Sequence, residues 1–370
     1  MKNWATLEGT LRFKQKQTEK QSLSPAHFRQ EQGLWLSSIG LGTYLGKEDQ
    51  ETDTNYAKAI ETAIESGCNF LDTAINYRHQ RSERVIGSTL KNLFEKKKIE
   101  RDEVVVATKG GFIPFDTAYP ADPYKYLQDH FVKYGALEAK DIVAGCHVMT
   151  PRYLEFEITQ SLKNLELDTL DIYYIHNPET QLEKLSKEAF YTALWDIFEM
   201  LENQVSLGRI RYYGAATWNG FRMEKEHSEN IQLQKIVQIA EEVAGIHHHF
   251  RFVQLPFNLA MPEALSVRNQ HIDGNDYSVL AIAKGLGLSV VTSASIMQGQ
   301  LSRDLPKEFK EKLNGLTTDA QRALQFVRST PGVTTALVGM GQPQHAKENL
   351  ETAKTSPIPE EKYQKLFLQN

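Results

Sequence analysis

Several features that would place a chain in a special class of protein are scarce or absent from these 370 residues. The chain has only two cysteines, Cys68 and Cys146, without metal-ligand or redox spacing, which favours a reduced, cytoplasmic protein over a secreted one. Its polar first 20 residues do not resemble a signal peptide, and no apolar run approaches the roughly 20 residues that span a bilayer. A net charge of −5 gives no electrostatic case for binding nucleic acid or an anionic membrane.

The composition that is present is that of a folded protein. Hydrophobic residues make up 41% of the chain and charged residues 24%, which excludes disorder as the main state. Residues 1–35 are polar and predict an irregular extension or a hairpin. Residues 36–370 carry regular patterns, and the length of the chain alone suits one large α/β domain or two smaller ones.

Within residues 36–370, short apolar runs alternate with stretches of helical periodicity. Runs of about five apolar and β-branched residues are typical of buried parallel strands. Eight strand–helix pairs in strict alternation predict an α/β fold, a single-domain (β/α)8 TIM barrel. The expected strands cover 37–43, 69–72, 103–108, 170–176, 210–215, 252–255, 288–292 and 334–338, and the expected helices cover 52–66, 82–94, 150–165, 188–206, 232–243, 277–284, 320–328 and 344–352.

One connection in this alternation is unusually long. Residues 110–149 separate an expected strand from a helix that Thr150 and Pro151 start as N-cap and first-turn residues. Such long connections are uncommon unless they are functional or disordered. This one is rich in phenylalanine and tyrosine, so we expect a lid or a packed excursion near the barrel mouth.

Four polar residues follow the ends of three of the expected strands. Asp72 ends one strand and Tyr77 lies in the loop after it, Lys109 ends the next strand, and His176 ends the one after that. Because strand C-termini of a barrel meet at one mouth, these side chains are expected to share a pocket. Together they could deliver a proton to a carbonyl oxygen. The alternative is a structural Asp–Lys pair with a core tyrosine and a strand-end histidine.

Carbonyl reduction needs a hydride as well as a proton. No side chain supplies hydride, so a nicotinamide cofactor is expected. A free tyrosine has a pKa of about 10, and a lysine at about 4 Å contributes about 4 kcal/mol at an effective dielectric near 20. We therefore expect Lys109 to lower the pKa of Tyr77.

The motifs around these residues resemble the aldo-keto reductase family. The resemblance rests on DTAINY at 72–77 with Ser82-Glu83 and Ile86-Gly87, on ATK at 107–109, and on LDIYYIHNP at 170–178. It runs from about residue 36 to about residue 354. It implies that Asp72 anchors Lys109 and that neutral His176 orients the carbonyl group.

The resemblance also implies a set of positions that bind NADP or NAD, with NADP slightly preferred. Several departures weaken that set. Ala216 and Thr217 replace two residues that hold the nicotinamide amide, and Ser293 replaces an aromatic residue that stacks on the ring. Gly339 and His345 stand where a lysine and an arginine usually hold the ribose phosphate of NADP, which weakens the preference for NADP. The positions are Gly42, Thr43, Tyr44, Asp72, Thr217, Gln254, Ser293, Ile296, Gln298, Gly339, Met340, His345, Glu348 and Asn349.

The function expected from all this is the NAD(P)H-dependent reduction of an aldehyde or ketone, or the oxidation of the corresponding alcohol or sugar. The alternatives are a cofactor-binding regulatory or scaffold protein with little turnover, and a barrel lyase or isomerase without nicotinamide. No metal site is expected at His247-His248-His249, and the neighbouring Cys146 and His147 are not expected to act as a nucleophile–base pair. The substrate and the oligomeric state stay open.

Overall fold

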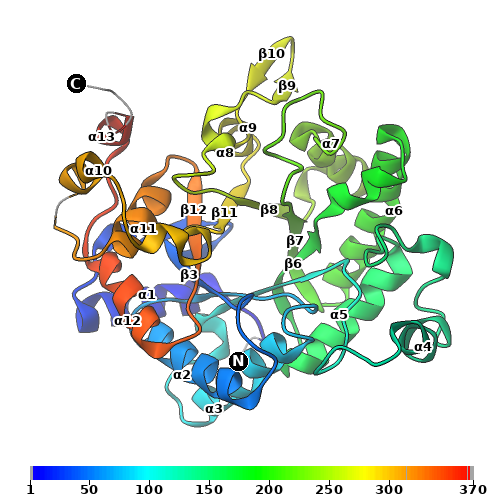
Figure 1. Ribbon diagram of the computed structural model, residues 1–370, viewed down its shortest axis with the longest axis horizontal. Coiled ribbons are helices and arrows are strands. Elements are labelled where there is room, and N and C mark those ends of the chain that lie inside the picture. The colour runs from blue at the N-terminus through cyan, green and yellow to red at the C-terminus, as the bar shows by residue number, and fades with distance from the viewer. Residues whose placement is uncertain (1–2, 314, 365, 367–370) are drawn as a thin grey trace.

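The computed structural model describes residues 3–313, 315–364 and 366. Eight parallel strands close into a barrel in the order β11–β12–β3–β4–β5–β6–β7–β8, which confirms the predicted (β/α)8 fold. Figure 1 shows the strands in the middle of the molecule and the helices in a ring around them. The barrel strands are β3 (Ile39–Gly42), β4 (Phe70–Asp72), β5 (Val105–Gly110), β6 (Leu170–His176), β7 (Ile210–Ala216), β8 (Phe250–Pro256), β11 (Ser289–Ser293) and β12 (Val333–Gly339).

One long helix follows each of these strands, and polar residues fix where several of the helices begin. The side chain of Thr150 accepts a hydrogen bond from the backbone of Tyr153 and Pro151 follows it, as the sequence predicts. Asp49 and Ser186 cap two further helices in the same way. The outer helices are α2 (Gln50–Glu65), α3 (Arg81–Glu95), α5 (Pro151–Leu165), α6 (Lys187–Ser206), α7 (Leu233–Ala244), α9 (Val279–Gly285), α11 (Asp319–Ser329) and α12 (Pro343–Glu351).

The barrel interior is a separate apolar cluster that is closed at one end by the N-terminal part of the chain. Residues from the strands, among them Phe70, Ile172 and Phe252, pack inside the barrel. Leu34 and Leu36 join them from an antiparallel hairpin of β1 (Phe28–Glu31) and β2 (Leu34–Ser37). The hairpin therefore plugs the end of the barrel opposite to the strand C-termini.

The expectation of irregular structure before residue 36 is wrong for Leu7–Gln21, which form helix α1. Thr6 caps this helix by accepting a hydrogen bond from the backbone of Gly9. The helical periodicity is weak because Phe13 is the one large apolar side chain that the helix buries; its other buried residues are Gly9, Thr10 and Gln17.

The long connection between β5 and α5 packs beside the barrel. It contains the short helix α4 (Pro123–Leu127) and one π-helical turn (Gln128–Val132). Phe131 is buried against Tyr153 and Phe156 of α5. Figure 1 places α4 at the outer edge of the molecule, next to α5. Of the two readings left open by the sequence, the packed excursion describes most of this segment.

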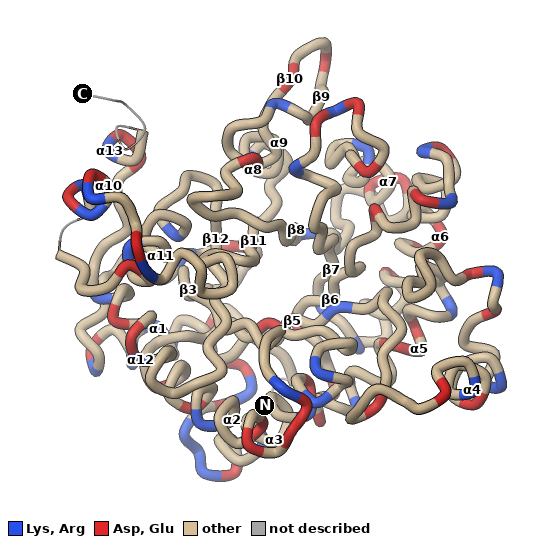
Figure 2. The backbone as a smooth tube through the Cα atoms, in the orientation of Figure 1, with Lys and Arg blue, Asp and Glu red and all other residues tan. Residues whose placement is uncertain are grey.

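Several smaller elements lie outside the ring of eight strand–helix pairs. A hairpin of β9 (Gln270–Ile272) and β10 (Asn275–Tyr277) follows α8 (Glu263–Ser266), and α10 (Lys307–Lys312) and α13 (Glu360–Gln364) lie near the C-terminus. The helix expected from residue 277 begins two residues later, because Tyr277 pairs in the hairpin and Ser278 caps α9. Charged positions lie mostly on the outer helices and loops (Figure 2). None of the helices in the described ranges has both the length and the apolar character that a membrane crossing requires.

Candidate active site

Neighbouring strands bring the four predicted polar residues together at the barrel mouth. Strands β4, β5 and β6 are adjacent and in parallel register, so Asp72, Lys109 and His176 emerge at the same end. The ammonium of Lys109 lies 2.6 Å from Asp72 Oδ1 and 3.5 Å from the hydroxyl of Tyr77. Tyr77 reaches this cluster from the loop after β4.

Lys109 and Asp72 form a buried ion pair. Lys109 also donates to the carbonyl of Thr73 at 2.8 Å, and Gln254 Nε2 donates to Asp72 Oδ2 at 2.7 Å. Burial raises the pKa of Asp72, although Lys109 and Gln254 oppose the shift. Burial also lowers the pKa of Lys109, although Asp72 opposes that shift. Each charge therefore depends on the other for its stability in the interior.

Tyr77 is a neutral phenol in this environment. Its ring lies edge-on to Tyr44 at 5.0 Å and to His176 at 5.7 Å between ring centroids. Burial raises the pKa of Tyr77 well above 10, and the charge of Asp72 raises it further. The expectation that Lys109 lowers this pKa is wrong for this structure. The ammonium is 0.9 Å closer to Asp72 than to the phenol, at 2.6 against 3.5 Å, and the negative charge of Asp72 opposes its effect on the pKa of Tyr77.

His176 is a neutral imidazole with a free ring nitrogen. Burial and the charge of Lys109 hold its pKa well below 6.5. Its Nδ1 has no hydrogen-bond partner among the described residues. A neutral ring with one N–H group can donate a hydrogen bond without carrying charge, as the sequence predicts for this residue.

His147 holds the backbone of His176, a contact that the sequence did not indicate. His147 is buried, and its Nε2 lies 2.7 Å from the carbonyl oxygen of His176. Its Nδ1 lies 2.8 Å from Nε2 of Gln181, which can only donate. The proton of His147 is therefore on Nε2, pointing at His176. Cys146 is exposed, so the two neighbouring residues face different environments.

The cluster opens into a cavity of about 1120 Å³ at the barrel mouth. Asp72, Tyr77 and His176 line the cavity, whereas Lys109 lies beneath it. All the predicted cofactor positions line it except Met340, whose side chain is buried in the core. Gly339 and Gly341 flank Met340 and face the cavity, so the chain alternates between the two sides at this point.

A family model for the "Aldo/keto reductase family" matches residues 38–243, which is more than half of the chain. The protein belongs to the aldo/keto reductase family. The resemblance noted in the sequence motifs is thereby confirmed.

Relatives of this aldo/keto reductase family member cover most of its length at low identity. It is 24% identical over 348 residues to the putative voltage-gated potassium channel subunit beta of Schizosaccharomyces pombe, which covers 89% of this chain and 88% of that protein. It is 22% identical over 346 residues to a 6-dehydroglucose reductase of Novosphingobium aromaticivorans, which covers 89% of this chain and 91% of that protein.

Solved structures share the barrel fold. The glycerol dehydrogenase of Gluconobacter oxydans aligns with a TM-score of 0.64 at 18% identity and covers 93% of this chain and 94% of its own. An aldo/keto reductase from Klebsiella pneumoniae, solved with NADP and acetate, aligns with a TM-score of 0.60 at 21% identity and covers 92% of this chain and 94% of its own.

The cavity of this family member has the features of a site for a long polar ligand. Asn76 Oδ1, Thr217 Oγ1 and His176 Nδ1 are buried and have no hydrogen-bond partner among the described residues. All three residues line the cavity. Its volume of about 1120 Å³ is slightly larger than the range of about 300–1,000 Å³ that small-molecule and cofactor sites usually occupy. These residues fit a nicotinamide dinucleotide, whose amide and hydroxyl groups need such partners.

Aromatic residues outside the predicted catalytic and cofactor positions also line the cavity, namely Tyr56, Phe112 and Trp218. Phe112 contacts the His176 ring with 4.9 Å between centroids, and Trp218 is 42% exposed in the loop after β7. Glu179 holds that loop, because its Oε1 accepts hydrogen bonds from the backbones of Trp218, Asn219 and Gly220. Aromatic residues are common throughout the loops of this sequence, so only their position in the structure shows which of them line the cavity.

The histidine triplet is part of a local hydrogen-bond network. His249 Nδ1 lies 2.7 Å from Glu202, so a carboxylate is nearer than the sequence indicated, and His248 is buried. No group of three potential metal ligands is found among the residues that the structure describes.

Proposed function

We propose that this protein is a nicotinamide-dependent oxidoreductase that reduces an aldehyde or ketone, or oxidises the corresponding alcohol or sugar. The observation that carries the proposal is the protonated Tyr77 hydroxyl at the cavity base, 3.5 Å from the ammonium of Lys109. Family membership and the oxidoreductase names of relatives support the same reaction type.

The residues have complementary roles in this proposal. A bound nicotinamide would supply hydride to the carbonyl carbon. The carbonyl oxygen would take its proton from Tyr77 while His176 donates a hydrogen bond to it. The phenolate that remains would lie beside Lys109, whose attraction at 3.5 Å is about 4–5 kcal/mol at an effective dielectric near 20, reduced by Asp72.

The cofactor is proposed to lie along the cavity, with Thr217 and Gln254 near the nicotinamide and Gly339 to Asn349 near the adenosine. NADP is favoured because similar structures were solved with NADP and with NADPH. The cavity lining itself offers little to bind an extra phosphate: among the described residues that line it, Lys47 is the one lysine or arginine, and Glu348 is proposed to lie near the adenosine. NAD is therefore the alternative.

A second function, nucleotide binding with little turnover, has its own support. Ala216 and Ser293 line the cavity where larger groups would hold and stack on the nicotinamide ring. One relative is named a putative voltage-gated potassium channel subunit beta, although its identity to this chain is only 24%.

Two measurements on the purified chain separate these functions. Tryptophan fluorescence would be titrated with NADPH and with NADH, because Trp218 lines the cavity. Turnover would then be followed with a panel of aldehydes, ketones and sugars, for the wild type and for Tyr77→Phe. If the protein is an oxidoreductase, the wild type should turn over at least one of these compounds. Tyr77→Phe should then lower the turnover rate by at least about a hundredfold and leave the nucleotide affinity unchanged.

The other outcomes are equally distinct. Tight nucleotide binding without turnover on any compound would favour the regulatory function. Absence of binding to either nucleotide would contradict both functions and favour a barrel enzyme without nicotinamide. Undiminished turnover in Tyr77→Phe would contradict the assignment of Tyr77 as the proton donor.

A further inference from the structure

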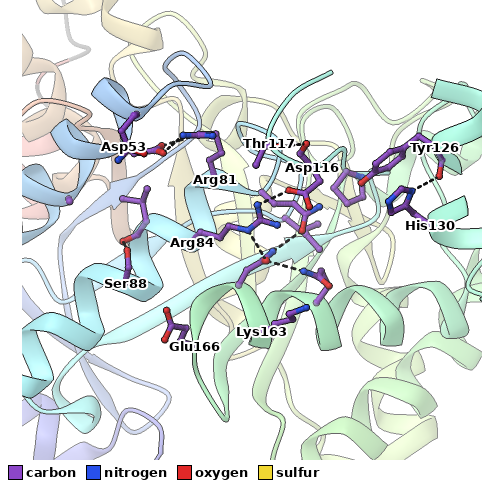
Figure 3. A pocket seen from close by; sticks show the side chains of 18 of the residues that line it. Asp53, Arg81, Arg84, Ser88, Asp116, Thr117, Tyr126, His130, Lys163 and Glu166 are labelled. Carbon is purple, nitrogen blue, oxygen red and sulfur yellow. Dashed lines mark hydrogen bonds and ion pairs between the residues drawn. The ribbon is translucent and has the colours of Figure 1, made fainter. Parts of the chain in front are cut away.

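A second cavity, of about 910 Å³, lies outside the barrel. Its walls are the outer faces of α2, α3 and α5 and the packed segment that follows β5 (Figure 3). It shares no lining residue with the cavity at the barrel mouth. Any ligand in this cavity would therefore be distinct from the substrate and cofactor proposed above.

One part of this second cavity is apolar and aromatic. Phe131 and Phe156 line it from the packed segment and from α5, and their rings contact each other at 5.6 Å between centroids. Tyr126 lies beside them and stacks on His130 at 4.0 Å with an interplanar angle of 16°. Flat aromatic faces of this kind favour a planar ligand body.

Two basic side chains in the cavity keep hydrogen-bond donors without partners. Arg84 donates from Nε to Asn164 at 3.2 Å and from Nη1 to Asp116 at 2.6 Å, which leaves its Nη2 without a partner among the described residues. Lys163, on the exposed side of α5, has no hydrogen bond or ion pair within the described part of the chain. Figure 3 shows Arg84 in the middle of the group, with Lys163 below it and Tyr126 to one side.

The surroundings of the cavity carry an excess of positive charge. Lining residues and their ion-pair partners comprise five basic and three acidic side chains, although the whole chain has a net charge of −5. Each of these three carboxylates already contacts a base. Buried Glu83 also accepts a hydrogen bond from Asn164 of the lining, so five basic side chains face four acidic ones and a positive excess of one remains. The basic residues are Arg78, Arg81, Arg84, Lys91 and Lys163, and the paired acidic ones are Asp53, Asp116 and Glu166.

We propose that this cavity is a binding site for an organic anion with a planar apolar body and one acidic group. The rings of Tyr126, Phe131 and Phe156 contact the body, and Arg84 and Lys163 bind the acidic group through charge-assisted hydrogen bonds. A carboxylate, a sulfonate or a phosphate has the required charge and acceptor oxygens. The positive surroundings exclude cationic ligands of the same shape.

The test uses 8-anilinonaphthalene-1-sulfonate, an aromatic anion whose fluorescence rises on binding. The full chain would be titrated with this dye in the presence of saturating NADP⁺, which occupies the barrel mouth under the proposed function. The variants Lys163→Gln and Arg84→Gln should each weaken dye binding by about tenfold, because each removes one charged contact. Lys58→Gln is the matched control, since Lys58 is an exposed α2 lysine outside the cavity lining.

A neutral dye separates charge recognition from general apolar binding. N-phenyl-1-naphthylamine has the same rings without the sulfonate, so its binding should be weaker and insensitive to both substitutions. Equal dye affinity in wild type, Lys163→Gln and Arg84→Gln would overturn the proposal. Absence of dye binding while NADP⁺ is saturating, together with dye binding when NADP⁺ is left out, would overturn it as well, by locating the dye at the barrel mouth. If NADP⁺ itself does not bind, the proposed function fails, but the comparison of variants still decides the second site.

Discussion

Replacing Lys109 with methionine should destabilise the protein by about 3–5 kcal/mol at neutral pH, the usual effect of removing one partner from a buried ion pair. The substitution removes the contacts at 2.6 Å to Asp72 and 2.8 Å to Thr73. Asp72 would keep one hydrogen bond, from Gln254 at 2.7 Å, and its Oδ1 would be left unpaired in the interior. Methionine fills most of the space of the lysine stem, so the loss of stability measures the effect of removing the charge and not the effect of a cavity.

The loss of stability in Lys109→Met should depend on pH, and the pKa of Asp72 determines the direction of this dependence. Burial raises the pKa of Asp72 in the folded protein, and the loss of Lys109 raises it further. A carboxyl whose folded pKa is above its unfolded pKa stabilises the fold below the unfolded pKa and loses that stabilisation as the pH rises through the folded pKa. The deficit of Lys109→Met should therefore shrink as the pH falls from neutral towards acid.

Urea denaturation without nucleotide, over a range of pH, measures this deficit, because a bound ligand would add its own stabilisation. The double variant Asp72→Asn/Lys109→Met removes both charges and should recover about 1–3 kcal/mol relative to Lys109→Met alone. A deficit that is independent of pH, together with strict additivity in the double variant, would refute the reasoning that the pair is held by charge.

Three further predictions follow from neighbouring contacts. His147→Leu removes the donor to the carbonyl of His176 and should lower stability by about 1–3 kcal/mol and also lower kcat. His147→Gln keeps a donor and should lose less of each. Thermal unfolding measures the stability and steady-state kinetics measure kcat. Gly111→Ala should lower the free energy of unfolding by more than about 2 kcal/mol in urea denaturation, because Gly111 has φ +138° and a Cβ there would lie 2.9 Å from His147 Nε2 and 3.0 Å from the carbonyl oxygen of His176. Gly145→Ala is the control and should cost less, because Gly145 also has a positive φ but its Cβ would meet no atom within 4 Å. Because the pKa of Tyr77 is raised well above 10, the rate of reduction should stay constant from neutral to mildly alkaline pH. The reverse oxidation needs the phenolate, so its rate should rise with pH. A rate of reduction that falls with an apparent pKa near neutrality would contradict a protonated phenol.

The parts of the fold that depend on regular patterns could be predicted from the sequence. Each barrel strand is a short apolar run, and strand C-termini must share one mouth, so the meeting of Asp72, Lys109 and His176 followed from connectivity alone. Helix α1 could not be predicted because Phe13 is its one large buried apolar residue, and helical periodicity needs several such residues to be visible.

The remaining errors concern properties that depend on three-dimensional surroundings. The direction of the pKa shift at Tyr77 depends on burial and on how closely Asp72 approaches Lys109, and spacing in the sequence contains neither quantity. Met340 is one of the cofactor positions that the family resemblance implies, but its side chain is buried in the core while its glycine neighbours line the cavity. The contact of His147 with His176 joins a loop to a strand end across 29 positions, and no local pattern marks it.

The hairpin that plugs the barrel contacts a strand that is synthesised much later. Arg29 of β1 donates to the carbonyls of Val333 and Thr334 at 2.5 and 2.7 Å, more than 300 residues later in the chain. During synthesis the plug leaves the ribosome long before its partners on β12. The barrel cannot close until β12 has been synthesised, so the earlier strands stay unpaired at one edge until then, and folding is expected to be slow.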